Sequence, residues 1–475
     1  MTVNKKTKIV ATLGPSCSKK NIIEEMILNG VDVFRINFSH ANHEEIKNQI
    51  EIIRELSADL NKNISILADL QGPKLRVGLI KEGSIVQKGD RVNFLTDEPF
   101  EGDNEKAYMT YKRFPKDVQK GEKILLDDGK LIFEVVSSDN KTCVVTKVIQ
   151  GGPFKSKKGV NLPNTKISLP ALTKKDIEDA IFAIKQEVDW IALSFVRNDK
   201  DLIELKSLIN KHSKHKIPII AKIEKPEAML NIDKIVSNCD GLMVARGDLG
   251  VEIPAAEVPL IQKQLVLIAK NARIPVIIAT QMMETMIDSL TATRAEVNDV
   301  ANSVMDGADA VMLSGETSIG KYPIEVIKTI TSILQKVENS PLIIVPHKPP
   351  NTRTKRFITK SICYHAAHMS NEINAKAICT LTNSGYTAFQ ISAWRPSATV
   401  LVFTSNKRIL SQLNLLWGVK SFYYDKFEST DNTIEEVNNI ALNSGFAKSG
   451  DMLINLAAMP ITNKGMVNTL RISIV

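Results

Sequence analysis

Eight short runs rich in β-branched residues constrain the fold most strongly, because each run ends in polar residues and most are followed by a segment with helical spacing. The runs are Thr7–Leu13, Val31–Phe38, Ile64–Leu70, Val188–Phe195, Ile217–Glu224, Gly241–Ala245, Pro275–Thr280 and Ala308–Leu313. Helical spacing is found in Asn42–Ala58, Lys174–Lys185, Asp199–His212, Thr293–Met305 and Pro323–Glu338. This repetition predicts an α/β TIM barrel, whose site lies at the carboxyl ends of the strands. A doubly wound sheet is the alternative, but it rarely has eight near-continuous parallel strands.

The connection between Leu70 and Leu169 is far longer than one barrel helix needs, and its pattern changes from helical to alternating. The segments with strand character are Ser84–Val86, Arg91–Leu95, Lys123–Leu126, Leu131–Val136 and Thr142–Val145. Asp128-Gly129 predicts a tight turn between two of them. We expect a small β-barrel domain at 71–168, inserted into a barrel domain of 1–70 and 169–340, and acting as a lid.

A proline-rich segment, Pro346-His347-Lys348-Pro349-Pro350, predicts a stiff linker over 341–354. After it, helices and strands alternate again, which predicts a C-terminal α/β open-sheet domain over 355–475. The expected helices are Arg356–Met369, Tyr386–Ala393, Arg408–Leu415 and Thr433–Asn443, and the expected strands are Ala377–Leu381, Thr399–Phe403, Val419–Tyr424, Met452–Leu456 and Thr469–Ser473.

Bulk composition narrows the class of protein. No apolar run is long enough to span a bilayer, and the amino terminus lacks a signal-peptide core, so we predict a cytoplasmic protein without a membrane partner. The net charge is +8, but the lysines are dispersed and no dense basic run with aromatic residues occurs. This pattern argues against nucleic acid and suits an enzyme of polyanionic substrates. The five cysteines form no CxxC pair, and we expect free thiols.

The second run ends in Arg35-Ile36-Asn37-Phe38-Ser39. Because strand side chains alternate, Arg35, Asn37 and Ser39 share one face. A guanidinium beside two small oxygen ligands suits a phosphate and a cation.

Four other strand ends carry comparable chemistry. Lys222 and Glu224 share a face at the end of the fifth run, and Asp248 follows the sixth between two glycines, Gly247 and Gly250. Because these strands are neighbours in a barrel, the two carboxylates are expected to reach one Mg²⁺ or Mn²⁺ ion. The third run carries Asp69 near its end, and the seventh ends in Thr280. His212, His215, His365 and His368 are interpreted as solvated or packed side chains rather than metal ligands.

Several blocks resemble the pyruvate kinase family, in the right order and over essentially the whole chain. They are Phe34–His40, Asp69–Arg76, Lys157–Pro163, Ala221–Glu227, Met243–Glu252 and Ala279–Glu284. The resemblance implies phosphoryl transfer from phosphoenolpyruvate to ADP in glycolysis, forming pyruvate and ATP on Mg²⁺ or Mn²⁺, and a homotetramer.

The resemblance also implies residue roles. Arg35 would hold the phosphate of phosphoenolpyruvate, and Lys222 would stabilise the transferring phosphoryl group and the enolate. Glu224 and Asp248 would bind the divalent ion, with Gly247 and Thr280 at the substrate carboxylate and Thr280 also on the path of the proton that reaches the enolate. The residues implied at the nucleotide are Asn37, His40, Arg76 and Lys158.

Two features depart from common members of the family. Many members need K⁺, held at positions matching Asn37, Ser39, Asp69 and a Thr at position 70, and carry Glu at position 74. Here these last positions are Leu70 and Lys74, so we predict that the Lys74 ammonium replaces K⁺.

The second departure concerns the C-terminal domain. The loop made of Thr382, Asn383, Ser384, Gly385, Tyr386 and Thr387 matches the effector phosphate loop of the family, at a strand-to-helix turn that favours phosphate. The Trp-Arg-Pro-Gly segment that some members use for fructose 1,6-bisphosphate is replaced by Met459–Gly465. We therefore expect a sugar monophosphate or AMP as the effector.

Two other functions remain open at this point. A TIM-barrel lyase or mutase acting on phosphoenolpyruvate or a 2-oxo acid would share the arginine and the carboxylates, but would need neither insert nor C-terminal domain. A metabolite-sensing or RNA-binding protein built on an inactive kinase should have lost one of the polar strand ends, and all are present.

Overall fold

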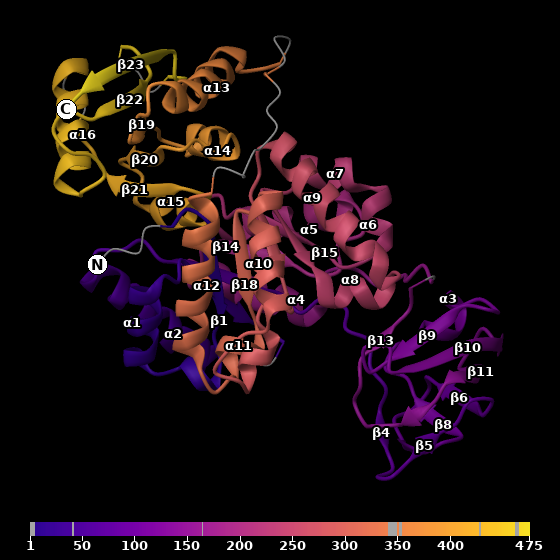
Figure 1. Cartoon of the computed structure of the whole chain (residues 1–475). Helices are drawn as coiled ribbons and strands as arrows, with labels where there is room; N and C mark the ends of the chain where they lie inside the picture. The colour runs from indigo at the N-terminus through magenta and orange to yellow at the C-terminus, as the bar shows by residue number, and fades with distance from the viewer. Residues whose placement is uncertain are drawn as a thin grey trace.

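In a computed structural model, the structure describes residues 5–39, 42–163, 165–340, 349–350, 354–426, 429–460 and 465–475. Eight parallel strands form a closed barrel, in the order β1-β18-β17-β16-β15-β14-β3-β2 (Figure 1). They are β1 (Lys8–Thr12), β2 (Val33–Asn37), β3 (Ser65–Asp69), β14 (Trp190–Leu193), β15 (Ile219–Ile223), β16 (Gly241–Ala245), β17 (Val276–Ala279) and β18 (Ala310–Leu313). The predicted TIM barrel is confirmed, and each strand falls within its predicted run.

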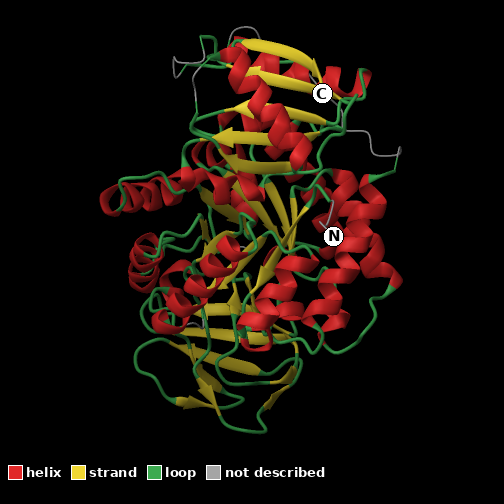
Figure 2. Cartoon of the chain, turned by 90° about the vertical axis from the view of Figure 1, so that its left-hand side faces the viewer, coloured by secondary structure: helices red, strands yellow, loops and turns green. Residues whose placement is uncertain are grey.

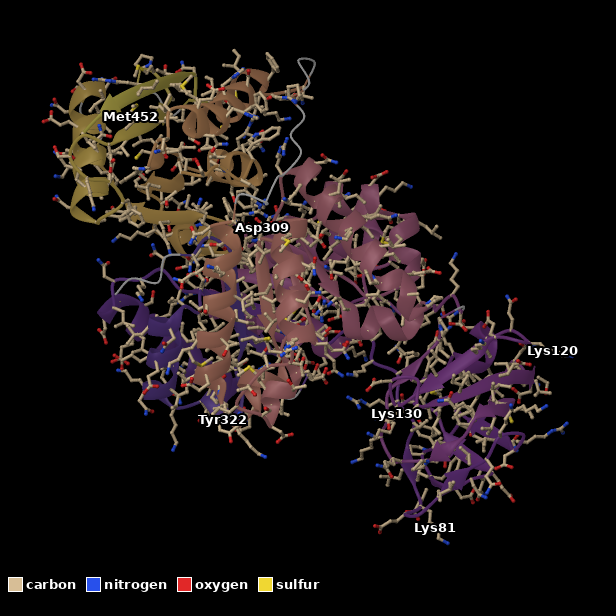
Figure 3. All side chains as sticks on the ribbon, viewed as in Figure 1. Lys81, Lys120, Lys130, Asp309, Tyr322 and Met452 are labelled. Atoms are coloured by element: carbon tan, nitrogen blue, oxygen red, sulfur yellow. The ribbon has the colours of Figure 1, made fainter. Side chains whose placement is uncertain are left out.

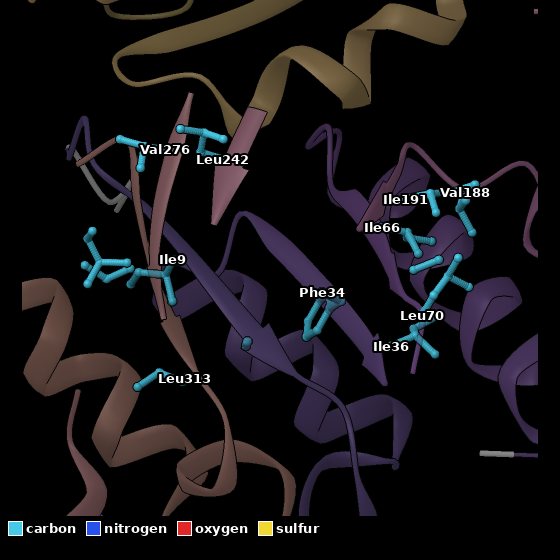
Figure 4. Close-up of a cluster of buried hydrophobic side chains, with 14 of the residues drawn as sticks. Ile9, Phe34, Ile36, Ile66, Leu70, Val188, Ile191, Leu242, Val276 and Leu313 are labelled. Carbon is cyan, nitrogen blue, oxygen red and sulfur yellow. The ribbon is translucent and has the colours of Figure 1, made fainter. Parts of the chain in front are cut away.

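Helices surround the barrel (Figure 2). The longer ones are α1 (Lys20–Asn29), α2 (His43–Asp59), α4 (Lys174–Lys185), α5 (Asp199–His212), α9 (Val258–Ala272), α10 (Arg294–Asp306) and α12 (Pro323–Glu338); shorter ones are α6 (Pro226–Leu230), α7 (Ile232–Asn238), α8 (Arg246–Glu252) and α11 (Gly315–Ser318). Thr173 and Thr293 begin α4 and α10 with capping boxes, which satisfy free backbone N–H groups at these helix starts. Outward-facing side chains such as Ile9, Phe34 and Ile66 belong to the buried layer between strands and helices (Figure 4).

The interior of the barrel forms a second core, which a residue from the far end of the chain completes. Its members are Val10, Val33, Leu67, Trp190, Ala192, Ile220, Met243, Ile277, Ala279, Ala310, Met312 and Leu415. Leu415 ends the short helix η4 (Leu413–Leu415), and the Trp190 indole donates to the Gln412 carbonyl at 3.1 Å. The Asn414 amide donates to the Asp32 carbonyl, just before β2. The C-terminal domain therefore closes the amino-terminal end of the barrel.

The insert is a β domain with its own core. Its main sheet has the order β13-β9-β10-β11-β6-β8, and β12-β5 and β4-β7 form two small sheets. The strands are β4 (Leu79–Ile80), β5 (Ile85–Val86), β6 (Arg91–Leu95), β7 (Glu101–Gly102), β8 (Lys106–Tyr108), β9 (Lys123–Leu126), β10 (Leu131–Ser138), β11 (Cys143–Gln150), β12 (Gly152–Pro153) and β13 (Val160–Asn161), with the short helix α3 (Phe114–Asp117).

The predicted small β-barrel domain is present as a half-barrel of six strands, and the segment 75–78 links its edges: the Val160 N–H of β13 donates to the Leu75 carbonyl, and the Gly78 N–H donates to the Tyr108 carbonyl of β8. The five strands that the sequence pattern missed have two or three residues each, too few to show alternation. The predicted tight turn is present between β9 and β10, where Asp127, Asp128 and Gly129 have φ of 50°, 57° and 83°.

The C-terminal domain is a five-stranded sheet in the order β21-β20-β19-β22-β23, parallel except for β23. Its strands are β19 (Ala377–Leu381), β20 (Thr399–Thr404), β21 (Val419–Tyr423), β22 (Met452–Ala457) and β23 (Thr469–Ile474), and its helices are α13 (Phe357–Glu372), α14 (Tyr386–Ala393), α15 (Lys407–Gln412) and α16 (Thr430–Asn443). The predicted helix Arg408–Leu415 is divided into α15 and η4. Most of the predicted linker, 341–348 and 351–353, lies outside the described residues.

Charged and aromatic side chains join the barrel to the C-terminal domain. Asp309, which precedes β18, lies at this junction (Figure 3) and pairs with Arg395 at 2.9 Å. The Arg273 guanidinium lies 3.5 Å from the centroid of the Trp394 ring, a close cation–π contact. Within the described ranges, no helix is both long and apolar enough to cross a membrane.

We predict that Leu415→Ala lowers the free energy of unfolding by about 2–5 kcal/mol, because it leaves a cavity in the inner core of the barrel. Chemical denaturation would measure the change. Leu230→Ala is the matched control, since Leu230 is 87% exposed and its truncation should change stability by less than about 0.5 kcal/mol. Equal, small effects of both substitutions would show that Leu415 is not part of the barrel core.

Candidate active site

Three strand ends bring opposite charges together at the carboxyl end of the barrel. Asp69 of β3 lies between two cations: its Oδ2 accepts from Arg35 Nε at 2.7 Å, and its Oδ1 lies 3.0 Å from Lys222 Nζ. The Lys222 ammonium also lies 3.0 Å from Glu224 Oε1. Because β2, β3 and β15 are separated in the barrel only by β14, side chains from distant parts of the chain form one network. The structure brings together the strand-end residues Arg35, Asp69, Lys222 and Glu224.

The charge state of this network follows from burial and from its partners. Burial by itself lowers the pKa of Lys222, but the carboxylates of Asp69 and Glu224 outweigh burial and raise it above its ordinary value. Burial raises the pKa of Asp69, and the Lys222 and Arg35 charges outweigh this effect and lower it. These shifts favour the ionised forms of Asp69 and Lys222, so an ammonium faces the site.

The two expected metal ligands, Glu224 and Asp248, have different surroundings. Glu224 is 1% exposed and its Oε2 accepts from the Phe195 N–H at 2.6 Å, whereas Asp248 in α8 is half-buried. Burial raises the pKa of Glu224, Lys222 opposes this effect, and the negative charge of Asp248 raises it further. Two carboxylates that repel each other in a buried site fit a divalent cation, which would relieve the repulsion. No cluster of three or more potential metal ligands (His, Cys, Asp or Glu) occurs in the described ranges.

Gly247, which precedes Asp248, contacts Thr280. The Gly247 N–H donates to Thr280 Oγ1 at 2.7 Å, and a Cβ added at Gly247 would lie 3.2 Å from that oxygen. Thr280 and Gln281 have φ of 70° and 55°, a conformation that costs energy for residues with a side chain. Arg246 supports this turn, because it donates to the Thr280 carbonyl at 2.7 Å and pairs with Asp299.

At the positions expected to form a monovalent-cation site, Asn37 and Leu70 accept hydrogen bonds from neighbouring protein groups. Asn37 Oδ1 accepts from the Ser39 N–H at 3.1 Å, and the Leu70 carbonyl accepts from the Ser194 hydroxyl at 2.6 Å. Lys74 is exposed and forms no ion pair within the described residues. It lines a cavity of about 410 Å³ at the hinge, together with three other cations, Lys112, Arg113 and Lys175.

The residues expected at the nucleotide lie on the insert and on β2. Arg76 donates to the Lys157 carbonyl at 2.9 Å, and Lys158 pairs with Asp127 at 2.8 Å, which lowers the pKa of that carboxyl group. His40 lies outside the described residues. Asn161 of the insert donates to Glu252 of the barrel at 2.9 Å, so the insert contacts the barrel directly.

The predicted effector loop precedes α14, where Gly385 has φ of 77°. The Gly385 N–H donates to Thr382 Oγ1 at 3.1 Å, Thr387 is buried, and Asn383 and Ser384 are exposed. The Arg356 guanidinium lies 4.6 Å from the centroid of the Tyr386 ring and borders a cavity of about 560 Å³ with Met459, Pro460 and Met466. Residues 461–464 of the predicted Met459–Gly465 segment lie outside the described residues.

Sequence reasoning missed three residues that support this site: Ser194, Arg246 in its contact with the Thr280 turn, and Glu316. The buried Glu316 carboxylate accepts from the Met283 and Ser314 N–H groups, which joins the ends of β17 and β18. Ser194 could have been found by alternation, because it shares a face with Trp190 and Ala192 in a run that was recognised. The other two lie outside the recognised runs.

Comparison with known proteins agrees with this geometry. The family model "Pyruvate kinase, barrel domain" matches residues 4–327, and "Pyruvate kinase, alpha/beta domain" matches residues 360–473. The pyruvate kinase of Corynebacterium efficiens is 42% identical over 99% of this chain and 98% of its own length. That of Mycobacterium tuberculosis is 39% identical over 99% of this chain and 98% of its own length.

A solved structure shows the same fold over nearly the whole chain. The crystal structure of a pyruvate kinase from Cryptosporidium parvum has a TM-score of 0.91 and 33% identity, and the match covers 99% of this chain and 96% of that one. The chain belongs to the pyruvate kinase family, enzymes of glycolysis that transfer the phosphoryl group of phosphoenolpyruvate to ADP on a divalent metal ion and form pyruvate and ATP.

Proposed function

We propose that this chain carries out the pyruvate kinase reaction with Arg35, Lys222 and Thr280 as its catalytic residues. The observation that carries the proposal is the buried Lys222 ammonium, held between Asp69 and Glu224 and next to Arg35. A fixed positive charge in a site of low dielectric stabilises the negative charge that develops on the phosphoryl group and on the enolate. Arg35 holds the phosphate of phosphoenolpyruvate, and its Nε contact with Asp69 fixes the guanidinium plane.

At the other end of the substrate, the Gly247 backbone, Asp248 and Thr280 bind the carboxylate side of phosphoenolpyruvate. The Thr280 hydroxyl accepts from the Gly247 N–H at 2.7 Å and donates to the Ala279 carbonyl at 2.6 Å, which together fix its position. Through this hydroxyl we route the proton that converts the enolate into pyruvate. Glu224 and Asp248 would hold Mg²⁺ or Mn²⁺, which would supply positive charge to offset the negative charge of the substrates. The family matches favour this reaction over the lyase or mutase alternative.

The nucleotide lies between barrel and insert in this proposal, against Asn37, His40, Arg76 and Lys158. Several cations face this region, including the four that line the hinge cavity, and cations attract a polyphosphate. The insert (71–168) acts as a lid that excludes water, between the two parts of the barrel domain (1–70 and 169–340). The separate hydrophobic cores of barrel, insert and C-terminal domain (355–475) support these domain boundaries.

We predict that Lys222→Met reduces turnover by at least about a thousandfold, because it removes the charge that stabilises the transferring group. A coupled assay with phosphoenolpyruvate and ADP would measure pyruvate formation. Lys270→Met is the matched control, since Lys270 is also buried but lies in α9, near Arg395 of the C-terminal domain. Near-normal turnover of the folded Lys222→Met variant would refute the role of Lys222.

The proposal also includes independence of K⁺. It is supported by Leu70 and Lys74 at two positions that differ in members requiring the ion, and by a Lys74 side chain without an acidic partner among the described residues. The exposed Lys74 ammonium can supply the single positive charge that K⁺ supplies in the members that require the ion.

We predict full turnover in buffer without Na⁺ and K⁺, and a requirement for K⁺ in Lys74→Glu. Removing the positive charge should lower activity in K⁺-free buffer by about tenfold or more, and added KCl should restore it. Lys112→Glu changes the same charge in the same hinge cavity and should create no K⁺ requirement. If the unmodified protein shows no turnover in K⁺-free buffer, Lys74 does not replace the ion.

We further propose allosteric activation by AMP or a sugar monophosphate at Thr382, Asn383, Ser384, Gly385 and Thr387. The start of α14 offers backbone N–H groups, and Asn383 and Ser384 are accessible.

We also infer a homotetramer that acts in the cytoplasm. β23 is an edge strand on which Ile472 and Ile474 are 44% and 75% exposed, and an exposed edge strand can pair with another chain. Sedimentation velocity showing only monomers would contradict the tetramer.

We predict that AMP or glucose 6-phosphate lowers the phosphoenolpyruvate concentration needed for half-maximal rate, and that Ser384→Glu abolishes this response. A carboxylate in the loop repels a phosphate, and the exposed position should tolerate it. Ser444→Glu, an exposed serine of the same domain, is the control. The proposed site is wrong if Ser384→Glu responds as the unmodified enzyme does.

A further inference from the structure

Ser194 lies one residue beyond the end of β14 and joins two functional segments through one hydroxyl group. Its Oγ accepts from Lys222 Nζ at 2.7 Å and donates to the Leu70 carbonyl at 2.6 Å. Ser194 is 2% exposed, so no bulk solvent competes for these bonds. A serine hydroxyl has one proton, and this proton is engaged by Leu70. The oxygen therefore turns its lone pairs toward Lys222 and acts as a fixed acceptor.

The hydrogen bonds of Lys222 show why this acceptor matters. An ammonium has three N–H donors; the Lys222 ammonium donates a hydrogen bond to Ser194 Oγ at 2.7 Å and forms ion pairs with Asp69 Oδ1 and Glu224 Oε1, each at 3.0 Å. Asp69 is shared with Arg35, and Glu224 belongs to the proposed metal site. Ser194 is the uncharged acceptor, and its oxygen is tied to the main chain. A lysine side chain has four rotatable bonds, so a bound anion could displace its ammonium unless a neighbour held it.

The position of Ser194 is itself tightly restricted. The next residue, Phe195, has φ of 53°, and its N–H donates to Glu224 Oε2 at 2.6 Å. On the other side lies Gly72, with φ of 70°, in the hinge that leads into the insert. A Cβ added at Gly72 would lie 3.0 Å from Ser194 Cβ and 2.9 Å from the Phe195 ring. The backbone on both sides thus holds the hydroxyl between Leu70 and Lys222.

We propose that Ser194 is a positioning residue for phosphoryl transfer, which holds the Lys222 ammonium in place through the Leu70 carbonyl of β3. It does not touch the reacting atoms and acts only through Lys222, so this inference rests on the role proposed above for Lys222. A loss of the hydroxyl should leave the charge of Lys222 in the site but allow the ammonium to move. A displaced charge weakens stabilisation of the transition state more than binding of the substrate.

The test compares Ser194→Ala and Ser194→Cys with the unmodified enzyme by steady-state kinetics and thermal unfolding. For Ser194→Ala we expect kcat to fall about tenfold or more, with KM for phosphoenolpyruvate changed less than about threefold. Ser194→Cys preserves the side-chain volume but offers a weaker acceptor, and an intermediate kcat is expected. Ser65→Ala is the matched control, because Ser65 is a fully buried serine at the amino-terminal end of β3, and its kcat should be unchanged.

Each outcome decides for or against the inference. A normal kcat in Ser194→Ala, or in a normally folded Ser194→Cys if the alanine variant does not fold, overturns it. A raised KM with normal kcat also overturns it, because the hydroxyl would then contribute only to substrate binding. The Lys222→Met variant separates the two proposals. If that variant stays active, the role of Lys222 fails, and if only the Ser194 variants stay active, the present inference alone fails.

Discussion

The pairing of β1 with β18 is the constraint on which the rest of the structure depends. It joins Lys8–Ala11 to Ala310–Leu313 in parallel register and closes the ring of strands. Once the ring is closed, the carboxyl ends of all eight strands lie on one rim. Arg35, Asp69, Lys222 and Thr280, which are distant in sequence, can then face a common space. An open sheet would spread the same strand ends along a line and could not surround a substrate.

Opposite charges are gathered inside that rim. Two carboxylates and two cations are buried together in Asp69, Glu224, Arg35 and Lys222, and removing such groups from water is costly even when they are paired. The arrangement leaves a permanent ammonium, whose pKa the carboxylates raise, beside a Glu224 whose pKa burial raises. An anionic substrate would complement the Lys222 ammonium, and a divalent cation would complement Glu224. In the structure described, Glu224 is instead paired with Lys222.

The C-terminal domain and the insert meet the barrel at its two opposite ends. Leu415 completes the inner core at one end, and Gly72 and Ser194 lie where the insert leaves the other end. Along β14, Trp190 contacts the C-terminal segment through its indole, and Ser194 contacts Lys222 four residues later. One strand therefore has the C-terminal domain at its first residue and the Lys222 ammonium just beyond its last.

Much of the fold was predictable from the sequence alone, because its signals are local. Alternation and β-branched runs located all eight barrel strands, and alternation also placed Arg35 with Asn37 and Lys222 with Glu224 on common faces. The half-barrel form of the insert was not predictable, since strands of two residues such as β4 and β13 exist only through pairing with distant partners.

The tertiary structure alone decided which distant groups meet. Sequence spacing contains no information that Asp69 lies between Arg35 and Lys222, that Leu415 enters the barrel, or that Ser194 binds both Leu70 and Lys222. These contacts depend on strand order and on closure of the ring, which are set by packing over the whole chain. The sequence by itself determined the residue types at each strand end and the faces on which they lie; their distances and charge states were decided only when burial and closure brought them together.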